Sequence, residues 1–133
     1  HINSSQSTRL MRIGDGNESA DKDYFYSQAV GVAKDIAEFD ISLMRVSKFK
    51  AVFEKNSSYG GAVNIDIKIY NQDKSVLYVT GKHYSASDQT IEYEFPYSTW
   101  FTSNSSIIIE ATPVTLYSAL TYFVCAARLE LTC

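Results

Sequence analysis

The sequence predicts an all-β protein, a two-sheet antiparallel β-sandwich that is jelly-roll-like and has about eight strands. Three observations predict this fold. Apolar and polar residues alternate with a period of two over much of the chain from Glu38 onward. Clusters of Ser, Asn, Asp and Gly separate the alternating runs at short intervals. The connections at 84–89 and 96–106 are too long for plain hairpins and suit crossings between two sheets.

The composition is that of one globular domain. The chain has 133 residues, of which 45% are hydrophobic and 14% aromatic, enough for a sizeable core. We expect residues 1–8 to be a loose polar lead-in and residues 9–133 to form the domain. The net charge of −3 does not indicate a nucleic-acid partner, and no apolar run approaches the roughly 20 residues of a membrane helix. Because the chain does not begin with Met, we expect a processed protein or a domain excised from a longer one.

The first third of the chain is the least regular. Residues 8–14 are a short strand candidate, and residues 15–23 have the composition of an acidic loop. The segment 23–39 allows two interpretations. Ser27 can cap a short helix that carries Val30, Ala33 and Ile36, or the segment can form two short strands.

Regular alternation begins at Glu38 and predicts the central strands. One side of the chain carries Phe39, Ile41 and Leu43, and the next run places its apolar residues opposite Lys48 and Lys50. The clearest hairpin follows, because the sequence "NQDKS" forms a turn and "VLYVTG" returns after it. Its first strand places four residues on the buried face: Val63, Ile65, Ile67 and Ile69.

Two further strands are expected to end at prolines. The run with Ile91, Tyr93 and Phe95 on one face is followed by Pro96, and "SIIIEAT" is followed by Pro113. Proline has no backbone N–H to donate to a sheet, so we expect both strands to stop there.

The tail "FVCAARLELTC" contains both cysteines, Cys125 and Cys133, on one face of an extended strand with Leu129 and Leu131. Eight residues of strand separate the two cysteines by about 26 Å, whereas a disulfide tolerates roughly 7 Å between Cα atoms. We therefore expect no bridge between them within one chain. Residues 122–127 are apolar on both faces, which predicts that both faces are covered. The core covers one face, and the other is covered by the second layer of a closed barrel or by a neighbouring chain, of which we favour the neighbouring chain.

No catalytic constellation is visible in the sequence. The motifs Gly-x-Ser-x-Gly, Gly-x-x-x-x-Gly-Lys and His-Glu-x-x-His are absent, and His83 is the only histidine inside the domain. We expect a non-enzymatic protein without a metal or cofactor. One weaker alternative is a calcium site in the acidic stretch, formed by Asp15, Asn17, Glu18, Asp21 and Asp23.

Two other surface features allow more than one interpretation. The stretch "RVSKFK" carries Lys48 and Lys50, either as protection of an edge strand or as a patch for anionic glycans. Asn-x-Ser sequons occur at four positions and hint at a secreted, glycosylated protein, although loops rich in Ser produce such motifs by themselves: Asn3, Asn17, Asn56 and Asn104.

The stretch "EFPYSTWF" is the best candidate for a binding site. It gathers the only Trp of the chain with other aromatic residues in an expected polar loop after a strand, where aromatic planes can stack on sugar faces. Alternatively, Trp100 and Phe101 plug the end of the core. We predict a ligand-binding site formed by Tyr97, Trp100, Phe101, Tyr84 and His83.

These features predict a recognition domain. The first hypothesis is the C-terminal receptor-binding head of a viral, phage or bacterial fibre or adhesin, a homo-oligomer with a trimer favoured, outside the cell or on the virion surface. Its partner would be a cell-surface receptor or a glycan, with no nucleic acid and no membrane insertion. The alternatives are a carbohydrate-binding module of a secreted protein and a structural or capsid subunit.

Overall fold

The computed structural model describes residues 17–19, 22–26, 30–54, 64–84, 87–115 and 122–133. At 17–19, 22–26, 54, 84, 115 and 122–128, the description concerns the backbone alone. The predicted lead-in at 1–8 and the strand candidate at 8–14 lie outside the described residues.

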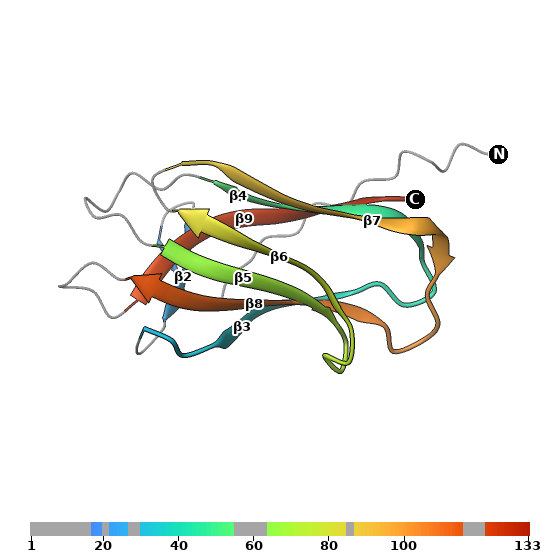
Figure 1. Cartoon of the computed structure of the whole chain (residues 1–133), viewed down its shortest axis with the longest axis horizontal. Coiled ribbons are helices and arrows are strands. Elements are labelled where there is room, and N and C mark those ends of the chain that lie inside the picture. Colours follow the sequence, from blue (N-terminus) through green and yellow to red (C-terminus); the bar gives the residue numbers. More distant parts are fainter. Residues whose placement is uncertain (1–16, 20–21, 27–29, 55–63, 85–86, 116–121) are drawn as a thin grey trace.

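The described residues form two antiparallel sheets that pack face to face (Figure 1). The five-stranded sheet has the order β1-β2-β9-β4-β7, and the four-stranded sheet has the order β3-β8-β5-β6. The strands are β1 Asn17–Ser19, β2 Lys22–Tyr26, β3 Lys34–Asp40, β4 Arg45–Glu54, β5 Asn64–Asn71, β6 Leu77–Tyr84, β7 Gln89–Trp100, β8 Ser106–Thr115 and β9 Tyr122–Thr132.

The strand pairing is that of a jelly roll. The pairs β5–β6, β4–β7, β3–β8 and β2–β9 are nested, as if one long hairpin had been folded over to make two sheets. Pairing of β9 with β4 and of β8 with β5 then completes the sheets. This order confirms the predicted β-sandwich of jelly-roll type.

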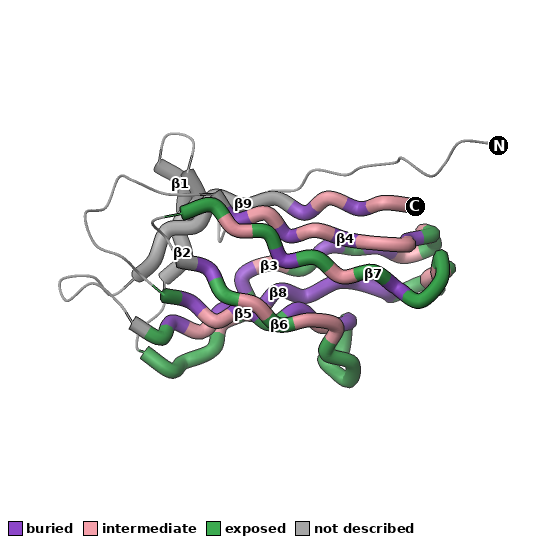
Figure 2. Tube along the Cα trace, turned by 45° about the horizontal axis from the view of Figure 1, so that its top comes forward, coloured by how far each residue is buried: buried purple, intermediate pink, exposed green. Residues whose placement is uncertain are grey.

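The core follows the predicted alternation (Figure 2). In β5, Ile65, Ile67 and Ile69 are fully buried, and Lys68 between them is exposed. The facing sheet contributes Phe49 and Phe53 from β4 with Leu129 and Leu131 from β9, and all of these are fully buried. The two sheets therefore bury one common apolar layer.

The tail is one continuous strand, as predicted. β9 pairs with β2 through residues 122–125 and with β4 through residues 126–132. Cys125 lies in this strand and Cys133 directly follows it, so the backbone holds them apart and Cys133 is a free, half-buried thiol. The prediction that both faces of 122–127 are covered concerns side chains that the structure does not describe.

The N-terminal segment is strand where the sequence allowed a helix. β2 and β3 occupy most of 23–39, so the two-strand interpretation is confirmed for the described part. Asn17–Ser19, expected in a loop, is instead β1, which pairs with β2. Residues of the calcium hypothesis lie outside the described residues or are described in their backbone alone.

Both proline predictions were wrong. β7 continues past Pro96 to Trp100, and β8 continues past Pro113 to Thr115. Pro96 lies in an edge strand at an irregular part of the register, where a missing N–H is tolerated. Pro113 is buried in a central strand beside a register shift, and its carbonyl accepts a hydrogen bond from Gly31 N at 2.9 Å.

The stretch "RVSKFK" is not at an edge, so the prediction of edge protection was wrong. β4 lies between β9 and β7 in the centre of its sheet. Lys48 and Lys50 each lie 3.8 Å from the same carboxylate oxygen of Glu92 on β7. This outer face therefore alternates in charge, and the glycan interpretation of the two lysines stays a prediction.

The face assignment of β5 can be tested with two adjacent substitutions. Ile67→Asp should cost several kcal/mol of unfolding free energy, because it leaves an unpaired carboxylate in the core. Lys68→Asp, one residue along on the exposed face, should cost about 1 kcal/mol or less. Denaturant unfolding measures both values, and equal losses would contradict the assignment.

Candidate functional site

One end of the sandwich is closed by two connections that run from one sheet to the other. Residues 41–44 join β3 to β4, and residues 101–105 join β7 to β8. Their backbones are hydrogen-bonded to each other, which satisfies polar groups that have left the sheets. The bonds are Ile41 N to Ser105 O at 3.0 Å, Leu43 N to Phe101 O at 3.0 Å and Phe101 N to Met44 O at 2.8 Å.

Leu43 is turned outward by this pairing. Its φ is +61°, a left-handed conformation that costs a non-glycine residue roughly 1–2 kcal/mol. Its side chain is 71% exposed, whereas Ile41 is fully buried. The alternation that predicted Leu43 on the buried side with Phe39 and Ile41 therefore fails at this residue.

Tyr97 is turned outward by a bulge in β7. Val46 of β4 pairs with Thr99 and Lys48 pairs with Glu94, so Ser47 alone faces four residues of β7, 95–98. In a regular strand, Tyr97 would share the inward face of Phe95. The extra residues change its direction, and Tyr97 is 73% exposed.

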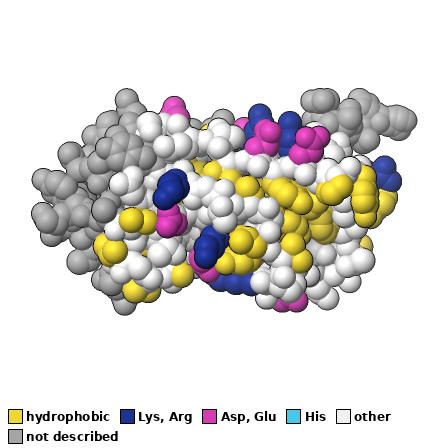
Figure 3. All heavy atoms as spheres, viewed as in Figure 1, with side chains coloured by type: hydrophobic (Ala, Val, Ile, Leu, Met, Phe, Trp, Pro, Cys, Tyr) yellow, Lys and Arg dark blue, Asp and Glu magenta, His cyan; other side chains and the backbone are white. Residues whose placement is uncertain are grey.

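Trp100 ends β7 beside Arg45, its partner on β4. The indole is 65% exposed, and the Arg45 guanidinium carbon lies 4.7 Å from its ring centroid, a cation–π contact. We call Leu43, Arg45, Tyr97 and Trp100 the tip. Figure 3 shows hydrophobic side chains gathered over the half of the molecule in which the end of β7 lies.

Phe101 has the structural role that the sequence also allowed for Trp100. It is half-buried and packs against the core, with its ring centroid 5.5 Å from that of Phe95. Phe95 in turn contacts Phe49, Tyr78 and Tyr93 at centroid distances of 6.1, 5.3 and 4.9 Å. An aromatic cluster therefore fills the core next to the tip, and Phe101 rather than Trp100 closes the core at this end.

His83 is buried near the other end of the sandwich, close to the end of β6 (Figure 1). Its ring lies 5.2 Å from that of Phe53, and its Nδ1 donates to Gln89 Oε1 at 2.9 Å. Among the described residues Nε2 has no hydrogen-bond partner, and burial lowers the pKa of the imidazole. The structure thus brings Tyr97, Trp100 and Phe101 together but places His83 elsewhere, and the Tyr84 side chain lies outside the description.

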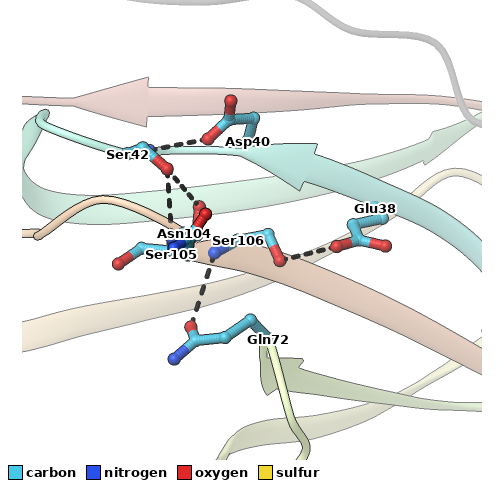
Figure 4. Close-up of a pocket in the computed structure, with 7 residues that line it drawn as sticks. All are labelled: Glu38, Asp40, Ser42, Gln72, Asn104, Ser105 and Ser106. Carbon is cyan, nitrogen blue, oxygen red and sulfur yellow. Dashed lines mark hydrogen bonds between the residues drawn. The ribbon is translucent and has the colours of Figure 1, made fainter.

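A polar pocket of about 490 Å³ lies beside the connections, on the side of the four-stranded sheet (Figure 4). Ser106 Oγ donates to Glu38 Oε2 at 2.9 Å, and the Ser42 backbone N–H donates to Asp40 Oδ1 at 2.9 Å. The lining residues are Glu38, Asp40, Ser42, Gln72, Asn104, Ser105 and Ser106.

The sequence did not reveal this pocket. Glu38 and Asp40 alternate with Phe39, which predicted a solvated face and nothing more. Two signals were present: two carboxylates stand near the end of a strand just before a connection, and the Asn104 sequon leads into the strand that begins at Ser106.

Among the described residues, no group of three His, Cys, Asp or Glu side chains is arranged to hold a metal ion. In the same part of the chain, no helix is long and apolar enough to cross a membrane.

Comparison with known proteins gives structural matches alone. No family model and no curated protein matches the chain. A chain in the structure of infectious bursal disease virus, Gx strain, is 16% identical with a TM-score of 0.48, and the match covers 98% of this chain and 33% of that one. A chain in the T13 particle of this virus is 20% identical with a TM-score of 0.46, and the match covers 98% of this chain and 32% of that one. A chain in its VP2 subviral particle is 16% identical with a TM-score of 0.45, and the match covers 98% of this chain and 34% of that one. The chain thus spans about a third of the chains that it matches, and the fold rests on its own strand order.

The pH dependence of stability tests the environment of His83. Its pKa is lowered in the folded protein, so below the ordinary value of about 6.5 the unfolded chain binds the extra proton. Stability should therefore fall as the pH drops below about 6.5, by at most about 1.4 kcal/mol per pH unit, and this contribution should be constant above that pH.

The matched comparison is His83→Phe, because the only other histidine, His1, is present in both proteins. Unfolding free energies at pH 7.5 and 5.5 should differ more in the wild type than in the variant. The same difference in both proteins would mean that His83 takes up its proton without unfolding.

Two substitutions at adjacent residues separate the surface role from the core role at the tip. Trp100→Ser should change the unfolding free energy by about 1 kcal/mol or less, because the indole is largely exposed. Phe101→Ala should cost about 2 kcal/mol or more, because it removes a ring that packs on the core. A larger loss for Trp100→Ser than for Phe101→Ala in denaturant unfolding would reverse these roles.

Proposed function

We propose that this chain is a non-enzymatic subunit of a protein assembly, of the structural kind that builds virus particles, and that it contacts other copies through the tip. The strand order supports this class, since jelly rolls of this connectivity form viral capsid domains as well as lectin domains. A fold by itself does not give a function, so we infer the contact between copies from the residues of the tip.

The exposure of three large side chains at one end carries the proposal. Leu43, Tyr97 and Trp100 are each at least 65% exposed. Leu43 is directed outward by its left-handed backbone, and Tyr97 by the bulge in β7, whereas regular alternation would have buried both. Exposed apolar groups of this size mark interaction sites, and Trp, Tyr and Arg are the residues that contribute most to protein interfaces.

Light scattering across a range of protein concentrations tests the proposal. The wild type should form a homo-oligomer, for which we expect three copies, while Leu43→Ser with Trp100→Ser should shift the equilibrium to monomer. The matched control is Val114→Ser, which removes an exposed apolar side chain from β8 and should leave the mass unchanged. A wild type that is monomeric at every concentration would refute assembly, and an oligomer unaffected by the double substitution would move the contact away from the tip.

Recognition of a receptor glycan is the second candidate, and it is favoured by the exposed rings of Tyr97 and Trp100. It corresponds to a receptor-binding head or a carbohydrate-binding module that works outside the cell or on the virion surface. Because Trp100 is the only tryptophan, a bound sugar should change the intrinsic fluorescence without changing the mass. A fluorescence change on adding glycans to a monomeric protein favours this candidate. The absence of any fluorescence change across a panel of glycans counts against it.

A further inference from the structure

The polar pocket is acidic and lies at the same end of the molecule as the tip. Glu38 and Asp40 are the charged residues of its lining, and the others are amides and hydroxyls. Glu38, Asp40, Gln72 and Asn104 are all exposed at its rim. A cavity with two carboxylates and amide groups suits a cationic group that carries several hydrogen-bond donors, such as a guanidinium.

Arg45 is an exposed cation with a defined orientation. Most described lysines are held by carboxylates of the same chain: Lys48 and Lys50 lie 3.8 Å from Glu92, Lys82 lies 3.3 Å from Asp66, and Lys74 lies 3.0 Å from Glu110. Arg45 instead lies against Trp100, and no carboxylate among the described residues pairs with it. Stacking on the indole keeps the guanidinium at the tip and leaves its donors available.

The two features lie on opposite sides of the sandwich. Arg45 begins β4 in the five-stranded sheet, whereas the pocket is lined by β3, the start of β8, the turn after β5 and residues of both connections (Figures 1 and 4). A contact between a cation on one face and an acidic pocket on the other joins different surfaces of two copies. Such a head-to-tail contact can close into a ring.

We infer that the pocket is the receiving site for Arg45 of a neighbouring copy. This inference rests on the proposed self-assembly and specifies its contact: the guanidinium enters between Glu38 and Asp40, and the exposed rings at the tip cover the rim. The opposite charges of the two surfaces select this partner and this orientation.

The test uses substitutions that remove charge and keep hydrogen bonds. Glu38→Gln retains an acceptor for Ser106, and Asp40→Asn retains one for the Ser42 N–H, so these two hydrogen bonds are kept. The combined pocket variant and Arg45→Gln should each raise the dissociation constant of the assembly at least tenfold at low salt. Lys82→Gln, a change at an exposed cation on β6, is the control and should have no effect.

The combination of all three substitutions decides the inference. If Arg45 binds in the pocket, the pocket variant and Arg45→Gln remove the same interaction. The dissociation constant of the triple variant should then be no higher than the higher of the values for these two variants. The inference would be overturned if the increases in dissociation constant of the two variants multiply in the triple variant. It would also be overturned if the pocket variant weakens the assembly and Arg45→Gln does not. A wild type that assembles with no response to either variant overturns this inference alone, whereas a wild type that never assembles overturns the proposed function with it.

Discussion

The hydrogen bonding between the two connections at 41–44 and 101–105 is the constraint on which the proposed site depends. Each connection leaves one sheet for the other, so its backbone polar groups lose their strand partners, and the two segments satisfy each other. The nested strand pairing brings them side by side, since β3 with β8 and β4 with β7 are neighbours. The fold thereby determines where Leu43, Arg45 and Trp100 lie, although these residues add little to the core.

The tip and the core are connected through aromatic rings. Phe101 packs on Phe95, and Phe95 packs on Phe49 in the centre of the sandwich. The exposed Trp100 is therefore followed directly by a residue that packs on the core, and an interface built on aromatic side chains loses less side-chain entropy on binding. Leu43 carries a local conformational cost that hydrogen bonds from its own connection offset, which links stability at this end with the presentation of an apolar side chain.

Alternation in the sequence predicted the features that depend on local periodicity. The buried face of β5 with Ile65, Ile67 and Ile69 and the inward residues Leu129 and Leu131 of β9 are confirmed. It could not predict features that arise between distant segments. The bulge that exposes Tyr97, the left-handed Leu43 and the central position of β4 depend on pairing with residues far along the chain. The acidic pocket is lined by three segments that are far apart in the sequence, so no local pattern predicts it.

Acrylamide quenching of Trp100 fluorescence, followed across protein concentration, tests whether the tip becomes buried when the protein assembles. Trp100 is the only tryptophan and is 65% exposed in the single chain, so its emission reports on the tip without a label. We expect strong quenching at low concentration and progressive protection of the indole as the mass rises. Quenching that stays equally strong while the protein assembles would contradict assembly through the tip, because the tip would then remain in solvent within the assembly.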